Sequence, residues 1–197
     1  MIRETEKNIK SSIGFIDEAV PFIDSTFINE FKEFARIDNS AEDVSLQSII
    51  ASAVQAAEKY LGRMLTTRRV YYGFDKMSRE IELPYPPLQT VEGVYVREED
   101  GTLTAVTTDD YYANIERIPG SVVFLQTATL PVALCDVEPF VIKYTAGYSD
   151  NVCDLPDAIK HAILVWANDG YQNRVIQPEP PIEVKSLLSL YSVERLY

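Results

Sequence analysis

One amphipathic stretch, residues 40–63, constrains the fold of this chain more than any other part of its sequence. Its apolar residues recur at steps of three and four, with glutamine, serine and lysine between them, which is the pattern of a helix with one buried face. Ser40 and Asp43 resemble a capping box, and Gly62 is a typical helix end. The pattern predicts a long helix over residues 41–63. Small residues let another backbone approach closely, and this helix has Ala51, Ala53, Ala56 and Ala57.

Two further helices are expected on either side of a long β-rich segment. Residues 26–35 have helical spacing of apolar residues, and Ser25 or Thr26 can cap them. Residues 156–173 begin with Pro156, a residue common in the first turn of a helix. Their apolar stripe is so wide that both sides of this helix must be covered. A pair of helices before the β segment and a core helix after it are therefore predicted.

Between residues 66 and 146 the hydrophobic period changes from helical to two. β-branched and aromatic residues alternate with polar ones, and Asp100-Gly101 is a strong hairpin signal. Strands are expected at residues 66–74, 79–84, 88–98, 102–106, 111–115, 121–125 and 139–144. The predicted fold class is α+β. A helical body, made of an N-terminal helix pair and C-terminal helices, carries an inserted antiparallel sheet or small β-barrel-like subdomain.

The chain divides by composition into three parts. Residues 1–22 show no sustained period and are interpreted as a flexible arm. Residues 23–174 are expected to form one domain, since no repeat or second core interrupts them. Residues 175–197 begin with a proline-rich linker, which is stiff and extended, and end in a short apolar segment.

Charge and composition limit the classes of function that the sequence favours. Thirty acidic against eighteen basic residues give a net charge of −12, which opposes binding to a phosphate backbone. No apolar run reaches the roughly 18 residues of a membrane helix, and the first residues lack a signal-peptide core. A soluble, cytosolic protein is expected. Cys135 and Cys153 form no CxxC motif and are expected to be free thiols.

The sequence offers little support for catalysis. The one histidine, His161, falls between the apolar positions of its helix, and the common motifs of hydrolases and nucleotide-binding proteins are absent. Acidic runs at residues 98–100 and 109–110 could hold a divalent ion, but solvated charge at hairpin tips is the simpler interpretation. Exposed tyrosines without a ligand motif favour a protein interface. No cofactor or metal is expected.

Several motifs in order resemble the phage head–tail connector family related to gp6-like adaptor proteins. They are FKEFARID at 31–38, the helix closing as AAEKYLGR, LPYPPLQTVEGVYV at 83–96, IKYTAGYSD at 142–150, LPDAIKHAILVWANDGYQNR at 155–174 and the terminal EVKSLLSLY. The resemblance covers residues 23–191. It implies a non-enzymatic virion protein that forms a ring, expected to be a dodecamer, beneath the portal protein, where it offers a platform to the next neck or tail protein. DNA would pass through the channel without specific binding.

The resemblance also implies roles for parts of the chain, and it places the protein in the virion neck and, during assembly, in the host cytoplasm. Residues 23–174 would be the connector domain and 175–197 a portal-docking tail, with contacts from Val184, Leu187, Leu188, Tyr191, Val193, Leu196 and Tyr197. A subunit interface is expected at Ala51, Ala56, Tyr60 and Arg63. Three alternatives stay open: a head-closure or tail-terminator protein, a small metal-dependent enzyme, and a prophage-derived interaction domain.

Overall fold

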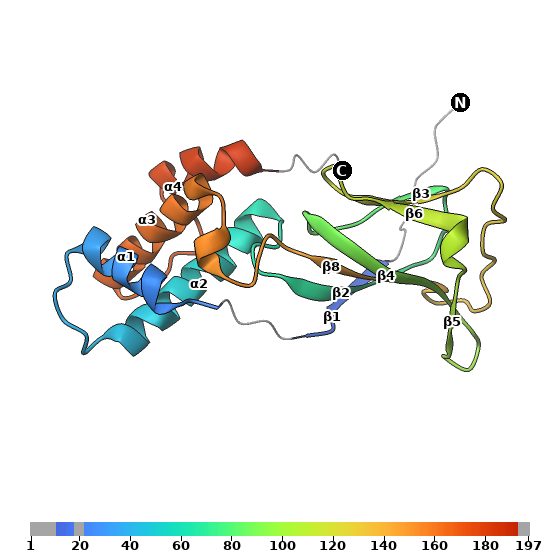
Figure 1. Ribbon diagram of the computed structural model, residues 1–197. Helices are drawn as coiled ribbons and strands as arrows, with labels where there is room; N and C mark the ends of the chain where they lie inside the picture. Colours follow the sequence, from blue (N-terminus) through green and yellow to red (C-terminus); the bar gives the residue numbers. More distant parts are fainter. Residues whose placement is uncertain (1–10, 18–21, 193–197) are drawn as a thin grey trace, which may run out of the picture. The chain divides into compact units, whose positions relative to one another are not determined.

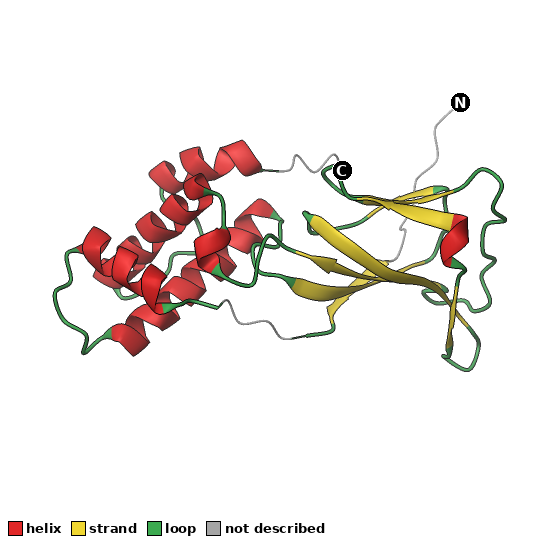
Figure 2. Cartoon of the chain, viewed as in Figure 1, coloured by secondary structure: helices red, strands yellow, loops and turns green. Residues whose placement is uncertain are grey.

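The computed structural model describes residues 11–17 and 22–192, and they form two compact units (Figure 1). The β unit contains the first described segment and residues 68–146, and the helical unit contains residues 22–67 and 147–192. Figure 2 shows the α-helices in one unit and the strands in the other. The α+β class and the inserted antiparallel β segment are therefore confirmed. The single domain expected from composition is divided into two units.

Four α-helices build the helical unit among the described residues: α1 (Ser25–Ala35), α2 (Asp43–Leu61), α3 (Asp157–Asn173) and α4 (Ile182–Leu188). α3 packs on both α2 and α4, which explains the wide apolar stripe seen in its sequence. Its Trp166 is fully buried, together with Phe27 and Phe31 of α1. Burial of such large side chains contributes roughly 2 to 3 kcal/mol each.

The ends of α1 and α2 differ in part from the sequence prediction. The N-cap of α1 is Asp24, whose Oδ1 accepts from the Phe27 N–H at 2.9 Å, so neither Ser25 nor Thr26 is the cap. α2 begins after Glu42, and no side chain caps it, so the Ser40 capping box was wrong. Gly62 ends α2 in the left-handed conformation, with φ of 64°, as predicted.

Eight strands form two antiparallel sheets in the described part of the β unit. The five-stranded sheet has the order β1-β2-β8-β4-β5, and the three-stranded sheet has the order β3-β7-β6. The strands are β1 (Ser11–Phe15), β2 (Arg68–Phe74), β3 (Glu80–Glu82), β4 (Leu88–Arg97), β5 (Leu103–Ala105), β6 (Tyr111–Asn114), β7 (Ser121–Phe124) and β8 (Phe140–Ala146). All seven strands expected between residues 66 and 146 are present.

β8 is the central strand of the larger sheet, and it is lined by buried side chains. Tyr144 is fully buried, and its hydroxyl donates to the Pro84 carbonyl at 2.6 Å. Burial raises the pKa of this tyrosine far above its usual value. The phenol therefore stays a neutral donor that ties β8 to the segment between β3 and β4.

β1 corrects the interpretation of the N-terminus. Residues 11–15 were expected to belong to a flexible arm, but they pair along their whole length with β2. Five residues that include a glycine are too few for a periodicity argument. The other residues of the expected arm, 1–10 and 18–21, lie outside the described residues.

The chain leaves the helical unit through a turn held by a buried carboxylate. Oε1 of Glu58 accepts from the Leu65 and Thr66 N–H groups, each at 2.9 Å, and from the Thr66 hydroxyl at 3.1 Å. Buried donors without a partner cost free energy. Glu58 thus fixes the chain direction just before β2.

Replacing Glu58 should show the importance of this acceptor. Glu58→Ala leaves two buried N–H groups without that partner and should lower the free energy of unfolding by about 3 kcal/mol. Glu58→Gln keeps one acceptor oxygen in place and should cost about 1 kcal/mol, because the charge and the second carboxylate oxygen are lost while the hydrogen bonds to Oε1 can remain. Urea unfolding of both variants measures the difference, and equal losses would contradict the assignment.

Asp24 should make the stability of the helical unit depend on pH. Hydrogen bonds from the Phe27 N–H and the Asn151 amide lower the pKa of Asp24 below its usual 3.8. A lowered pKa stabilises the folded state above the unfolded pKa, and this contribution is lost as the pH falls through the folded pKa. Asp24→Asn can still cap the helix but cannot titrate.

The melting temperatures of wild type and Asp24→Asn provide the test. The wild type should be the more stable at pH 7, and its advantage should shrink below pH 3.8. A constant difference over the whole range from pH 7 to about pH 3 would exclude the ionised Asp24 as its source.

Candidate assembly surfaces

The predicted docking tail is partly built into the core of the helical unit. Val184 and Leu188 of α4 are fully buried, and Leu187 and Tyr191 pack partly against the same core. The side chains that remain outside are Ile182, 74% exposed, and Leu190, 76% exposed. Val193, Leu196 and Tyr197 lie outside the described residues. Of the described tail, Ile182 and Leu190 are therefore the apolar side chains most accessible to a partner.

An ion pair helps to hold the start of α4. Lys185 Nζ lies 2.8 Å from Glu179 Oε2 in the linker. The hydrogen bond from Lys185 lowers the pKa of Glu179, and the same bond raises the pKa of Lys185. Both groups are exposed, so this pair orients the linker and contributes little to stability.

The predicted subunit interface on α2 falls into two parts. Ala51 and Ala56 are half-buried and pack at the margin of the core, and Tyr60 is exposed. Arg63 is buried, and its Nη1 donates to the Tyr148 hydroxyl at 3.0 Å. A neighbouring subunit could contact the first three residues but little of Arg63.

The exposed face of α2 carries no charge over most of its length. No charged residue occurs between Asp43 and Glu58, although 24% of the whole chain is charged. The exposed side chains include Val44, Gln47, Ser48, Ser52 and Gln55. A helix face of this composition can approach another protein without desolvating charge.

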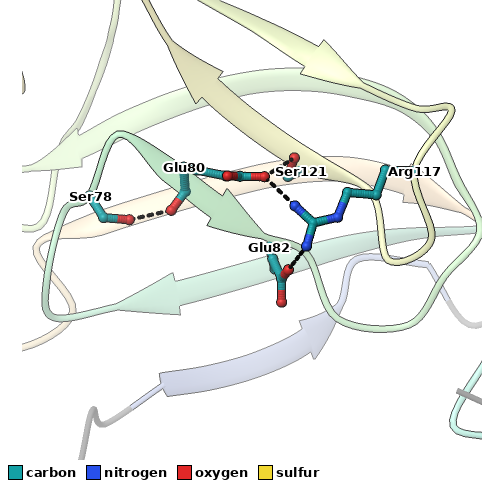
Figure 3. Close-up of polar contacts among 5 residues, drawn as sticks. All are labelled: Ser78, Glu80, Glu82, Arg117 and Ser121. Atoms are coloured by element: carbon teal, nitrogen blue, oxygen red, sulfur yellow. Dashed lines mark hydrogen bonds and ion pairs between the residues drawn. The ribbon is translucent and has the colours of Figure 1, made fainter. Parts of the chain in front are cut away.

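A polar cluster covers the outer face of the three-stranded sheet (Figure 3). Arg117, from the loop between β6 and β7, lies between Glu80 and Glu82 of β3, with both ion pairs at 2.6 Å. The Ser121 hydroxyl donates to Glu80 at 3.2 Å, and Ser78 donates to the Glu80 carbonyl. Charges of this kind protect an edge strand from pairing with another chain. The sequence analysis missed this cluster, because its members come from separate segments.

The acidic runs considered for metal binding serve local structure. Asp100 Oδ1 accepts from the Thr102 N–H at 2.8 Å, which closes the hairpin turn and lowers the pKa of Asp100. Asp109 and Asp110 lie in a short 3-10 helix, Thr108–Asp110, and not at a hairpin tip as expected. No group of three or more potential metal ligands occurs among the described residues.

The remaining predicted residues are also placed. His161 is exposed and its ring meets Phe34 edge to face. Cys135 and Cys153 are free thiols. Burial and the neighbouring Asp24 raise the pKa of Cys153 to about 11, so this thiol is protonated at neutral pH. Within the described ranges, no helix is both long and apolar enough to cross a membrane.

Comparison with protein families identifies part of the chain. Residues 26–116 match the family of phage gp6-like head-tail connector proteins. The resemblance inferred from the sequence is thereby confirmed for this segment, which holds α1, α2 and the strands from β2 to β6. The motifs after residue 116 lie beyond the matched range. No curated protein matches the chain.

Solved structures extend the likeness over nearly the whole chain. A chain in the neck of an empty gene transfer agent (GTA) particle, computed with C6 symmetry, is 21% identical, with a TM-score of 0.76. A chain in the virion of a native GTA particle is also 21% identical, with a TM-score of 0.74. A third, from the neck of a native GTA particle computed with C12 symmetry, is 20% identical, with a TM-score of 0.74. Each covers 94% of this chain and 97% of the other. The overall fold is therefore shared.

Proposed function

We propose that this chain is a non-enzymatic structural protein in the neck of a phage or phage-like particle. It forms a connector ring beneath the portal protein and offers a platform to the next neck or tail protein. The observation that carries this proposal is the fold shared over 94% of the chain with a protein of a GTA neck. The family match over residues 26–116 supports the same role. Assembly takes place in the host cytoplasm, and the finished protein belongs to the virion.

The proposed assembly is a ring of twelve subunits. Neck structures that contain chains of this fold were computed with C6 and C12 symmetry, and twelve copies fit both. The uncharged face of α2, with Ala51, Ala56 and Tyr60, is the proposed contact to a neighbouring subunit. Small side chains allow close approach there, while the opposite face of α2 is already used by the chain's own core.

The net charge fits a channel that conducts DNA. At −12 per subunit, twelve subunits surround the channel with a strongly negative field. Such a field repels the phosphate backbone, so the genome slides without being held. No base-specific or phosphate-binding role is proposed.

The C-terminal segment is the proposed contact to the portal protein. Val184 and Leu188 anchor α4 in the chain's own core. They therefore hold α4 in position but do not themselves contact the portal protein. Ile182 and Leu190 then present exposed apolar side chains, and Val193, Leu196 and Tyr197, outside the described residues, are proposed to join the same contact. Truncation before α4 would remove part of the core, so it cannot separate docking from folding.

Point variants at Ile182, the first residue of α4, and at Leu190, just after α4, test docking without truncation. Ile182→Asp and Leu190→Asp should each weaken binding of the assembled ring to the portal protein by about tenfold, since each buries a charge in an apolar contact. Their melting temperatures should match wild type, because both side chains are exposed. Tyr112→Asp, at an exposed position of the β unit (51%), is the control and should bind normally.

Pull-down experiments with the portal protein and with the tail tube test whether this protein is the connector beneath the portal or a tail-terminator protein. Binding to the portal supports the proposal. Binding to the tail tube alone would overturn it in favour of a tail-terminator protein. Equal portal binding by wild type, Ile182→Asp and Leu190→Asp would contradict the docking role of residues 182–190 and leave the ring proposal standing.

Substitutions of two alanines of α2 distinguish a defect in ring assembly from a defect in folding. Ala56→Leu should abolish ring formation with little change in melting temperature, since Ala56 is only half-buried. Ala53→Leu should instead destabilise the subunit by about 1 to 3 kcal/mol, because Ala53 is fully buried and has no space for a larger side chain. Light scattering measures assembly, and thermal unfolding measures stability. Unfolding of the subunit by Ala56→Leu would contradict the interface.

A further inference from the structure

β1 is an edge strand without the usual protection against pairing. It is the outermost strand of the five-stranded sheet, and residues 11–16, SSIGFI, contain neither a charge nor a proline. Ile13 is 40% exposed and Phe15 47% exposed. Natural edge strands are commonly blunted by charge, proline or a covering segment. β3, with Glu80, Glu82 and Arg117, has such protection, whereas β1 has none from the described residues.

The buried face of the sheet continues onto this edge. Phe15 lies opposite Val70 in the register of β1 and β2, and Val70 is fully buried. Residues directly opposite each other point to the same face of a sheet. Ile13 and Phe15 therefore extend the core face of the sheet to its rim, where part of that apolar surface is exposed.

The backbone of β1 has peptide groups that point away from β2. The Ile16 N–H donates to the Arg69 carbonyl at 2.9 Å, and Gly14 and Ser12 follow at steps of two. In an antiparallel pair, hydrogen-bonded and non-hydrogen-bonded positions alternate. The N–H and C=O groups of Ile13 and Phe15 are thus directed to the free edge, where an added strand can bind them.

A second segment of the β unit has complementary properties. Residues 129–134, between β7 and β8, have no regular secondary structure, and no backbone hydrogen bond joins them to another described residue. Val132 is 74% exposed and Leu134 50% exposed. The whole stretch from Ile118 to Cys135 is free of charge in a chain of net charge −12.

We propose that residues 129–135 of one copy add as a strand to the β1 edge of a neighbouring copy. Both segments have peptide groups and apolar side chains that no other described segment pairs with. Pro131 has no N–H, but in an antiparallel pair with Val132 and Leu134 opposite Ile13 and Phe15 its peptide nitrogen points away from β1. Joining two different surfaces in this way is a head-to-tail contact, which cyclic symmetry requires. This inference rests on the proposed ring, and it adds a second contact to that of α2.

The alternation of side chains makes the pairing testable. If Val132 and Leu134 continue the face of Ile13 and Phe15, Cys135 lies on the face of Gly14. Side chains on one face of neighbouring strands are close enough for a disulfide. A Cβ at Gly14 would meet only the Tyr71 Cβ, at 4.0 Å, so a cysteine fits there.

The experiment is disulfide crosslinking in assembled rings of full-length protein. The parent carries Cys153→Ser, which leaves Cys135 as the one thiol. Gly14→Cys in this parent should give, on mild oxidation, a ladder of intermolecular disulfides up to ring size on non-reducing gels. Ile13→Cys places its thiol on the other face and should give no ladder. Adding Cys135→Ser to Gly14→Cys should abolish the ladder.

Two further variants test the contact without a crosslink. Val132→Asp and Ile13→Asp should each cause loss of rings in electron micrographs, with the subunit still folded. Ile118→Asp, at a comparably exposed apolar position of the same unit, should leave the rings intact.

The outcomes separate this contact from the ring itself. Rings that form without a ladder, or an intramolecular disulfide alone, would overturn strand addition between copies and leave the ring proposal standing. Rings that still form with Val132→Asp and with Ile13→Asp would also overturn strand addition and leave the ring proposal standing. Wild type that never forms rings, alone or on the portal protein, would overturn the ring proposal and this contact with it.

Discussion

The carboxylate of Glu58 is the interaction on which the architecture depends. It holds the Leu65 and Thr66 N–H groups just where the chain leaves the helical unit. The returning segment binds the same place, since the Tyr148 N–H donates to the Leu65 carbonyl at 3.2 Å and Ser149 accepts from the Thr67 N–H at 3.1 Å. Residues 68–146, the larger part of the β unit, can be inserted here because the two ends of this segment are held side by side. In the β unit the same ends meet again, where Arg68 pairs with Ala146.

Charge is distributed in a way that suits assembly. The chain has a net charge of −12, but three regions carry no charge: most of the exposed face of α2, the edge at β1 and the segment 129–135. The β1 edge and the segment 129–135 expose apolar side chains, which promotes association, whereas the exposed face of α2 has mainly uncharged polar side chains. In the proposed ring, all three regions are contacts between copies. At the edge strand β3, by contrast, the ion pairs of Arg117 with Glu80 and Glu82 oppose pairing with another chain.

Residues with the same pattern in sequence have different roles in the structure. Val184 and Leu188 looked like docking residues because they form an apolar repeat after a linker, yet they complete the core of their own unit. Ile182 and Leu190, from the same segment, are the exposed ones. Arg63 was assigned to an interface and is buried against Tyr148. In each case the partner comes from a part of the chain far away in sequence.

The sequence by itself determined the α+β class, the long helix ending at Gly62, the positions of seven strands and the resemblance to head–tail connectors. The fold class, the helix and the strands follow from short-range physics, since periodicity and turn residues are local properties. The resemblance rests instead on the likeness of several motifs to those of that family. Only the tertiary structure decided that the chain divides into two units, that β1 closes the edge of a sheet and which apolar side chains remain exposed. The physical reason is that burial depends on which distant segment covers a residue, and local amphipathicity carries no information about that segment.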